Sequence, residues 1–503
     1  MTVSRRKVLK AGLVGGGMAM LPFGLMKNAW AAPGKTLVRY NVLSQEGQKM
    51  LAIYADAVKK MMAKDPRDPL SWTFQWYTHA MPGDRPKAET IEKMYGPGSS
   101  PNKELAKAMW WTCEPHASKG VNSNAFLPWH RMYVVYFEQI IRAVSGRPDF
   151  TLPYWDYTGP YSASGNNYSV MPKQFLLEKD PVWGPLYRPD RNPGSNAGKP
   201  VVDAGNPLDL SCMKWPNYAD KGTVAGFCSN INGNPHGALH GDVGNQKGMG
   251  QVPWAANDPI FWLHHANIDR IWASWNKSGG KNPNDSAFLN ETWVFADGAG
   301  KGIKVKVSEV LDTTTLAYPY VYAEYAERPK GSLPFPSAQK NFQLRAESVA
   351  PGATAKAIAL GGKATSVALQ VPVAVNALKQ SFGAQLKALP SNSVYALSFD
   401  AIDANGEPGN NYLVYLGLPA GAAPTPEYLV GGISMFGVGM QGMHGGHHAS
   451  STRVSFLVGE RIHGLLAAGG LEAAPTVTLV PIGEPNPGTE PTIGSITLQS
   501  LAV

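Results

Sequence analysis

The chain has 503 residues, of which 44% are apolar and 16% are charged, so it can bury a large core and is not a disordered protein. Its net charge of +8 falls to +3 when the five basic residues of positions 1–31 are set aside. No block rich in Lys or Arg follows them, which excludes a protein built to bind nucleic acid or another polyanion.

Residues 1–31 have the features of an export signal. The twin-arginine segment Ser4–Lys10 precedes an apolar, Gly-rich stretch, and Ala29-Trp30-Ala31 is a small-x-small cleavage site. We therefore expect export by the twin-arginine pathway to the periplasm or beyond, and a mature chain without a membrane span. An uncleaved membrane anchor is the alternative. Because this pathway carries folded proteins, the signal also hints at a cofactor.

The chain up to residue 330 reads as one mainly α-helical domain, residues 32–330. Ser44 is a good N-cap, and apolar residues recur at helical spacing after it. A long Gly/Pro/Asn-rich segment, 158–235, shows little periodicity and is expected to be a functional loop region. The predicted helices cover Ser44 to Lys64, Trp72 to His79, Glu104 to Cys113, Arg131 to Val144 and Pro259 to Trp275.

The sequence pattern changes from helical spacing to short β-rich runs after a linker at Pro334-Phe335-Pro336. Short β-rich runs separated by turn residues predict a β-sandwich-like C-terminal domain, residues 331–503. The runs are 342–344, 357–360, 366–373, 393–399, 412–417, 451–458 and 476–481.

Histidines carry the chemistry of the helical domain. Three lie early in the chain, at His79, His116 and His130, and His236, His240, His264 and His265 follow. His236 and His240 are spaced i, i+4, which places both rings on one face of a helix. Asp269 lies four residues after His265 and is expected to support that ring or its neighbourhood. Two sets of three imidazoles, without a carboxylate cluster, favour a transition metal.

Each of these features also has a plainer interpretation. A His pair at i, i+4 is often a solvated helix face, and a single His in an aromatic segment is often part of a core. The joint pattern decides between them. Phe126-Leu127-Pro128-Trp129-His130-Arg131 opens one amphipathic helix, and Asp258-Pro259-x-Phe261-Trp262-x-x-His265-x-x-x-Asp269 opens another.

With these two motifs the chain resembles the type-3 copper proteins, which are the tyrosinases, polyphenol and catechol oxidases and haemocyanins. The resemblance covers about residues 37–330. It implies a four-helix bundle that holds two copper ions, with O2 as co-substrate. It also implies that His79, His116 and His130 bind the first copper, that His236, His240 and His265 bind the second, and that His264 does not bind.

The activity implied by the resemblance is the oxidation of o-diphenols to o-quinones by O2, with hydroxylation of monophenols as an extension. Asn232 and Gly237 stand near places where hydroxylating members often have Glu and Asn, which favours diphenols. Asp242 is a candidate base for the phenolic proton, and its alternative role is that of a turn residue. The partners are then small phenolic molecules, and a homo-oligomer is left open.

Three other functions compete. They are an o-aminophenol oxidase of the same copper type, a haemocyanin-like O2 carrier and a dinuclear metal hydrolase. The hydrolase is disfavoured because such sites generally bridge their metals with carboxylates.

The cysteines and one loop supply further expectations. Cys212 and Cys228 lie in the irregular segment before His236, which predicts a disulfide, with two buried thiols as the alternative. The resemblance suggests a thioether from Cys113 to an imidazole, against a plain free thiol. It also suggests that the C-terminal domain covers the copper site. The Met- and His-rich segment 435–448 would then pass copper inward, unless it is only a surface connector.

Overall fold

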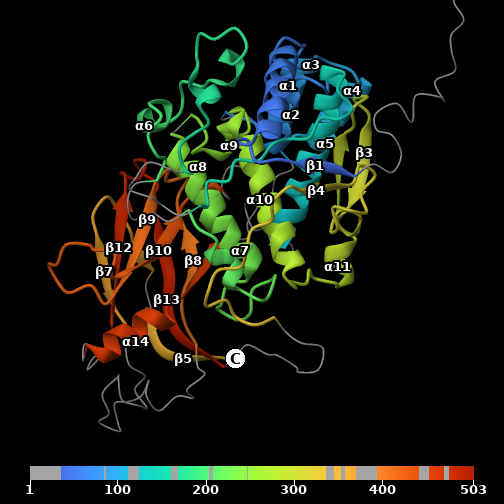
Figure 1. The fold of residues 1–503 in the computed structure, drawn as a ribbon. Helices are drawn as coiled ribbons and strands as arrows, with labels where there is room; N and C mark the ends of the chain where they lie inside the picture. The colour runs from blue at the N-terminus through green and yellow to red at the C-terminus, as the bar shows by residue number, and fades with distance from the viewer. Residues whose placement is uncertain are drawn as a thin grey trace, which may run out of the picture.

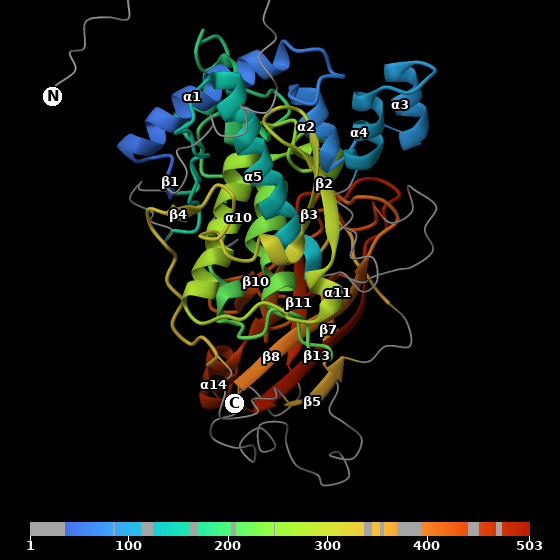
Figure 2. The same ribbon diagram turned by 90° about the vertical axis from the view of Figure 1, so that its right-hand side faces the viewer.

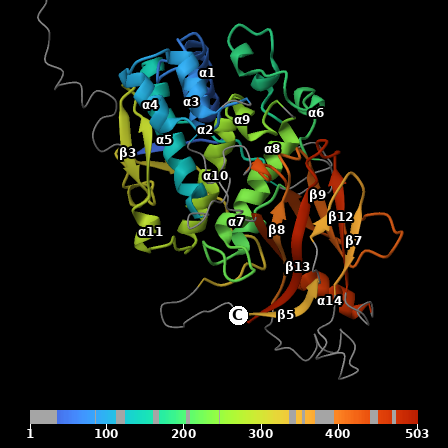
Figure 3. The same ribbon diagram turned by 180° about the vertical axis from the view of Figure 1, so that it is seen from behind.

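The structure is a computed structural model, and it describes residues 36–83, 86–111, 124–159, 168–202, 208–245, 247–335, 345–352, 357–369, 394–440, 452–468 and 475–502. The export signal, His116, Cys113 and residues 441–448 lie outside these ranges. A helical part and a sheet-rich part lie against each other, with α7 and α8 on the side that faces the sheets (Figure 1, Figure 3). The predicted mainly α domain followed by a β-rich domain is therefore confirmed.

The helical part is built around four helices, α1 (Gln45–Met62), α2 (Trp72–His79), α5 (Phe126–Ser145) and α10 (Ile260–Lys277). Further α-helices surround them, namely α3 (Lys87–Tyr95), α4 (Pro101–Met109), α6 (Pro193–Asn196), α7 (Phe227–Ile231), α8 (Ala238–Val243), α9 (Val252–Ala255) and α11 (Ser286–Leu289). The remaining turns are η4 (Lys173–Leu176), η5 (Gly184–Leu186), η6 (Ser211–Lys214), η8 (Val307–Glu309) and the π-helical η7 (Asn232–Gly237).

Local sequence explains where these helices begin and end. The Ser44 hydroxyl accepts the Gly47 N–H at 3.0 Å, so the predicted N-cap of α1 is confirmed. Helix α5 begins at Phe126, five residues before its predicted start, because Pro128 falls in the first turn, where a missing N–H costs nothing. It ends at Gly146, whose φ of 70° suits a residue without a side chain.

Two pairs of strands complete the helical part. Strands β1 (Leu37–Arg39) and β4 (Tyr320–Tyr322) are parallel, so that the beginning and the end of this part are held side by side. Strands β2 (Thr292–Ala296) and β3 (Gly302–Lys306) form an antiparallel hairpin.

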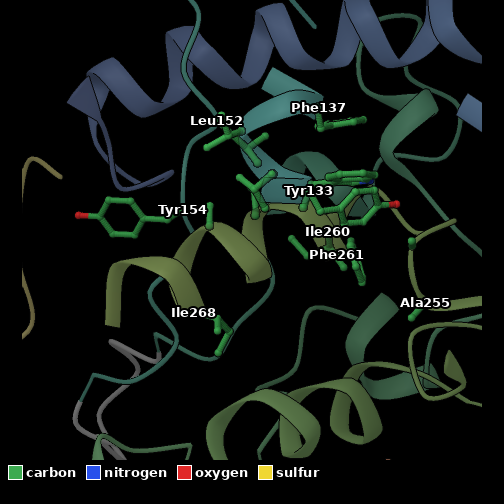
Figure 4. Packing of buried hydrophobic residues seen from close by; sticks show 14 of the residues in the cluster. Tyr133, Phe137, Leu152, Tyr154, Ala255, Ile260, Phe261 and Ile268 are labelled. Atoms are coloured by element: carbon green, nitrogen blue, oxygen red, sulfur yellow. The ribbon is translucent and has the colours of Figure 1, made fainter. Parts of the chain in front are cut away.

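Helices α5 and α10 run side by side through the middle of the helical part (Figure 2). The rings of Phe137 and Trp262 stack at 3.4 Å between them, and Tyr133 lies 4.5 Å from Trp262. Figure 4 shows Tyr133, Phe137, Ile260 and Phe261 gathered in this aromatic core. Because it fixes the rotation of both helices, the core also fixes where His130 and His265 point.

A buried ion network joins the same two helices to β1. The Arg39 guanidinium donates to both oxygens of Glu138 on α5, at 3.0 and 2.9 Å, and to Asp269 on α10 at 2.9 Å. Arg131 pairs with the other oxygen of Asp269 at 2.5 Å, and the hydroxyls of Tyr320 and Tyr322 donate to Asp269 as well. The expectation that Asp269 supports the His265 ring is thus wrong, because its carboxylate is fully used by cations and phenols one helical turn away.

The C-terminal part is a sandwich of two antiparallel sheets. One has the order β10-β9-β12-β7 and the other the order β11-β8-β13-β5, with β6 also paired to β13. Apolar residues of both sheets form a core of their own. The strands are β5 (Arg345–Gly352), β6 (Ile358–Ala359), β7 (Thr365–Ala368), β8 (Val394–Asp403), β9 (Asn411–Leu416), β10 (Leu429–Ser434), β11 (Thr452–Leu457), β12 (Thr476–Ile482) and β13 (Thr492–Ala502), and α14 (Gly459–Ala467) follows β11.

Hydrogen bonds join the sandwich to the helical part along β11, the outer strand of its sheet. The Ser455 N–H donates to the Asn230 side chain at 3.0 Å, and the Ala225 N–H donates to the Ser455 hydroxyl at 2.9 Å. Arg453 pairs with Asp220 across the same boundary at 3.4 Å. The edge of this strand is therefore covered by the segment that leads into α7.

Hydrogen bonds and ring packing hold the described part of the irregular segment before His236. Cys212 and Cys228 are buried and form no disulfide, so the predicted disulfide is wrong. Backbone bonds from Phe227 N to Asn217 O (2.8 Å) and from Cys228 N to Tyr218 O (2.9 Å) fix the segment instead. The Phe227 ring also stacks on Trp275 at 4.5 Å. Among the described residues, the helices all fall short of the length and apolarity needed to cross a membrane.

Candidate metal centre

Five of the six histidines predicted to bind metal meet at one buried place, and the sixth, His116, lies outside the described residues. His79 ends α2, His130 lies in the first turns of α5, His236 in η7, His240 in α8 and His265 in α10. Each is at most 3% exposed. The His130 ring lies 5.9 Å from that of His79, 6.0 Å from that of His236 and 4.4 Å from that of His265. The two predicted groups of ligands thus face each other.

Backbone carbonyls orient four of these rings through Nδ1. His79 Nδ1 lies 3.2 Å from Val252 O, and His130 Nδ1 lies 2.7 Å from Phe126 O. His236 and His240 make the same contact with Asn232 O at 3.0 Å and Met249 O at 2.8 Å. A carbonyl only accepts, so Nδ1 carries the hydrogen and Nε2 keeps the lone pair that a metal needs.

The second group contains one imidazole more than expected. Nitrogen atoms of His236, His240, His264 and His265 all lie within 4.8 Å of one another. His264, which we expected to point away, stacks its ring on His236 at 5.3 Å while its Nδ1 bonds the Tyr157 hydroxyl at 2.7 Å. Buried nitrogens without a hydrogen-bond partner in the described part of the chain remain on His240, His264 and His265. Such orphaned acceptors are what a site for a metal ion requires.

Burial keeps these imidazoles uncharged. Loss of solvent lowers the pKa of His79 to about 3, against a smaller opposing effect of its bond to Val252. It also holds the pKa of His240, His264 and His265 well below the usual range, with further lowering from neighbouring histidines. Neutral imidazoles bind a metal without first losing a proton. The all-nitrogen donor set suits copper and not calcium or magnesium.

Aromatic rings from both parts of the chain wall the centre. Phe261 lies 4.2 Å from His265, and Phe126 lies 4.7 Å from His130 and 4.6 Å from His236. Phe436, which follows β10 in the sandwich, stacks flat on His240 at 3.9 Å and 3°. The C-terminal part thus contributes one side chain to the wall of the centre, and its role as a covering domain stays a prediction.

The remaining sequence predictions fall in different places. Asp242 faces away from His240 by helical geometry, and its carboxylate accepts from Asn411 at 3.4 Å. It lines a cavity of about 540 Å³ between α8 and the sandwich, so its role as a base stays a prediction. Of the segment 435–448, residues 435–440 are described, and Met440 packs near Ala80 and Val252 beside the centre.

Sequence reasoning missed residues that shape the centre. Glu407 and Tyr157 stand far from the histidine motifs, and neither belongs to a recognisable pattern. Phe436 lies in the segment 435–448, which was expected to pass copper inward, but the role of its ring was not predicted. One signal was available for the close approach of the sandwich. The residues that follow His236 and His240 are Gly237 and Gly241. A Cβ added at Gly237 would press on Ser434, and a Cβ added at Gly241 would press on Asn411.

Comparisons with known proteins agree with this geometry. Residues 69–278 match the family described as the common central domain of tyrosinase, and residues 282–328 match the polyphenol oxidase middle domain. Residues 347–500 match a family described only as a domain of unknown function.

Two relatives and two solved structures illustrate the match. A tyrosinase of Hahella sp. (strain CCB-MM4) is 31% identical over 54% of this chain and 61% of its own length. Polyphenol oxidase II of Ipomoea batatas is 29% identical over 46% of this chain and 44% of its own. The chain therefore spans less than two thirds of these relatives. The structure of latent apple tyrosinase superposes with a TM-score of 0.59 at 22% identity, over 94% of this chain and 99% of that one. Latent aurone synthase, a polyphenol oxidase, gives a TM-score of 0.60 at 19% identity, over 93% and 90%.

Proposed function

We propose that this chain, in which residues 69–278 match the common central domain of tyrosinase, is a binuclear copper oxidase that uses O2 to convert o-diphenols to o-quinones. The observation that carries the proposal is the meeting of buried, neutral imidazoles from α2, α5, η7, α8 and α10. We assign His79, His130 and His116 to the first copper and His236, His240 and His265 to the second. Two copper ions held in this way supply reversible two-electron chemistry with O2.

The chain's own residues prepare the site for that chemistry. The carbonyls of Val252, Phe126, Asn232 and Met249 hold each ring in one tautomer, so that no proton has to move when copper binds. Phe261 and Phe126 exclude water from the space between the rings. A dry, preorganised site lowers the cost of reorganisation during oxidation.

Access to the site depends on the C-terminal part. The Phe436 ring lies on His240 where an aromatic substrate would stack, so we propose that the described state is closed. A phenol enters once Phe436 moves aside. The two similar solved structures are those of a latent aurone synthase and a latent apple tyrosinase, and this latency is in keeping with a covering role.

The competing functions differ in donor set and in turnover. A dinuclear hydrolase is disfavoured because the four-histidine group contains no carboxylate. A haemocyanin-like carrier would bind copper and O2 but would not turn over catechols. An o-aminophenol oxidase would share every residue named above, so only the substrate separates it.

One experiment separates all of these. The protein is analysed for metal content as purified, and it is then loaded with copper and assayed with a monophenol, the matching catechol and the matching o-aminophenol. We expect two coppers per chain and the fastest turnover on the catechol. Zinc in place of copper would favour the hydrolase, and copper without turnover on any of the three would favour the carrier. Faster turnover of the aminophenol would move the assignment to that substrate class.

Export by the twin-arginine pathway remains part of the proposal. Its support is the sequence of residues 1–31 alone, because these residues lie outside the described ranges. Fusion of residues 1–35 to a reporter that is active only after folded export would test it, with Arg5→Lys and Arg6→Lys together as the control that blocks transport.

A further inference from the structure

A single carboxylate lies at the boundary between the two parts of the chain. Glu407 belongs to the loop between β8 and β9 and is 7% exposed. Its two oxygens accept the N–H of Val252, in the helical part, at 3.1 and 3.3 Å. One of them also accepts the N–H of Gly437, in the sandwich, at 3.2 Å. The carboxylate therefore ties two separate segments of backbone to each other.

Both segments lead directly to the histidine centre. The carbonyl of Val252 holds His79 through Nδ1 at 3.2 Å. Gly437 follows Phe436, whose ring stacks on His240 at 3.9 Å. Glu407 is thus connected to both predicted copper groups, to His79 through Val252 and to His240 through Gly437 and Phe436.

No cation balances this carboxylate in the described part of the chain. Burial raises the pKa of Glu407 from 4.5 to about 8, against the smaller opposing effect of its two backbone donors. The titratable groups around it are His79 beyond Val252, Tyr412 beside Asn410, and Asp242 and Glu484 in the neighbouring cavity. A carboxylate released into water would ionise in its usual range.

We propose that Glu407 is a positioning residue that clasps the C-terminal domain onto the histidine centre at low pH and releases it as the pH rises. The regulation it implies rests on the proposed copper oxidase function, whereas the clasp itself does not. Docked, the carboxyl is protonated and fits the dry boundary. Undocked, it ionises and is solvated, which favours the open state.

The sign and the size of the effect follow from linkage. A group whose pKa is raised on docking stabilises the docked state below its free pKa, and this stabilisation is lost as the pH rises toward the docked pKa. For Glu407 the window runs from about pH 4.5 to about pH 8. A shift of this size weakens docking by up to about a thousandfold across the window.

The test uses the full chain without metal, so that it depends on neither copper nor turnover. Small-angle X-ray scattering is recorded at pH 5, 7 and 9 for the wild type, Glu407→Gln, Glu407→Ala and Glu484→Gln. The Gln variant keeps an oxygen where Val252 and Gly437 donate but cannot ionise. Glu484, an exposed carboxylate that lines the cavity at the same boundary, is the matched control.

We expect the radius of gyration of the wild type and of Glu484→Gln to increase with pH, while Glu407→Gln stays compact throughout. Glu407→Ala, which lacks both acceptors, should be extended already at pH 5. The proposal is overturned if Glu407→Gln expands with pH as the wild type does, or if Glu407→Ala stays compact at every pH. A protein that binds no copper would contradict the proposed function but would leave this result standing.

Discussion

At the scale of single residues, the centre is shaped by which ring nitrogen is already engaged. Four imidazoles have Nδ1 bonded to a carbonyl, whereas His265 has both ring nitrogens without a partner in the described chain, and His264 bonds Tyr157. His264 and His265 are therefore adjacent in sequence but differ in which of their ring nitrogens are hydrogen-bonded. The His265 ring is held by packing alone and keeps both nitrogens for a metal, whereas the His264 ring is held by a hydrogen bond to a phenol.

We expect His265→Ala to lose one of the two coppers and His264→Ala to keep both. The reason is that the Tyr157 bond fixes the His264 ring, whereas no such bond competes for His265. Metal analysis after desalting measures the stoichiometry. Retention of full copper by His265→Ala, together with loss by His264→Ala, would exchange the roles of the two residues.

A second prediction concerns Phe436. Its replacement by Ala removes the ring that covers His240, so a catechol no longer competes with it. A stacked aromatic pair contributes about 0.5–1.5 kcal/mol, so KM should fall by roughly two- to tenfold with little change in kcat. Steady-state kinetics on catechol measure both constants. Phe456→Ala, in the sandwich core, is the control for general loosening, and an equal fall in KM there would contradict a local role of Phe436.

The residues that sequence could predict were those with a pattern. His236 and His240 were found through their i, i+4 spacing, and His130 and His265 through their motifs. Phe436 and Glu407 reach the centre only through the docking of a second domain, which local spacing does not encode. Asp269 was misassigned because its partners, Arg39, Tyr320 and Tyr322, are far away in the chain.

At the scale of elements, α5 and α10 are coupled by the ion network as well as by their aromatic core. The guanidinium groups of Arg131 and Arg39 hold the pKa of Asp269 below its usual range even though burial alone would raise it. The ionised carboxylate therefore stabilises the folded state above about pH 4, and this contribution is lost as the pH falls further.

We expect Asp269→Ala to lower the free energy of unfolding by about 3–5 kcal/mol, because it leaves the buried Arg131 without a counter-charge and removes one of the two carboxylates that pair with Arg39. Urea unfolding at pH 7 measures the loss. Asp65→Ala is the control, since that carboxylate forms an exposed ion pair with Arg67. A loss no larger than that of the control would mean that the network contributes little to stability.

Helix α8 depends on a close backbone approach at its end. A Cβ on Gly244 would overlap Gly250 N and the carbonyl carbon of Met249, so the backbone that holds His240 would have to shift. Gly244→Ala should weaken copper binding by about 10- to 100-fold, the usual effect of losing a partner that orients a ligand. Competition with a copper chelator measures it. Gly459→Ala, where a Cβ would meet open space, should bind copper as the wild type does.

Helices in which apolar residues recur at regular spacing were predicted well, whereas strands defined by pairing with distant segments were not. Helix α2 was predicted to the residue, and α1 and α10 to within two residues. Strands β10 and β13 were missed. Gly431 and Gly432 weaken the alternation of apolar and polar residues in β10. The segment before Thr492 is rich in Gly and Pro and hides the start of β13. Both are defined by their partners β9 and β8, which the local sequence does not reveal.

At the scale of the whole molecule, each part of the chain has a large hydrophobic core of its own, and small apolar clusters as well as hydrogen bonds join the two parts at their boundary. Asn230 is central to that boundary, since its side chain donates to Ala225 O and Gly226 O and accepts from Ser455 N. The order of the two domains was predictable from the change in sequence texture near residue 330. Their docking was suggested only by resemblance.

We expect Asn230→Ala to weaken docking by about 1–3 kcal/mol, because the Ser455 N–H is left without its acceptor in the docked state. The variant should turn over catechol faster than the wild type at the same copper content. Ser366→Ala, which alters a hydroxyl pair within the sandwich, is the control. Unchanged turnover in Asn230→Ala would show that the boundary does not limit access.

The covered edge of β11 affects how the protein behaves in solution once its two parts separate. When the domains part, Ser455 and its neighbours present unpaired backbone groups along an outer strand, which is a template for strand addition by other chains. The open protein should then self-associate, and the quinones that we propose it makes would cross-link the associated chains. Opening therefore limits the time for which the protein stays active in solution.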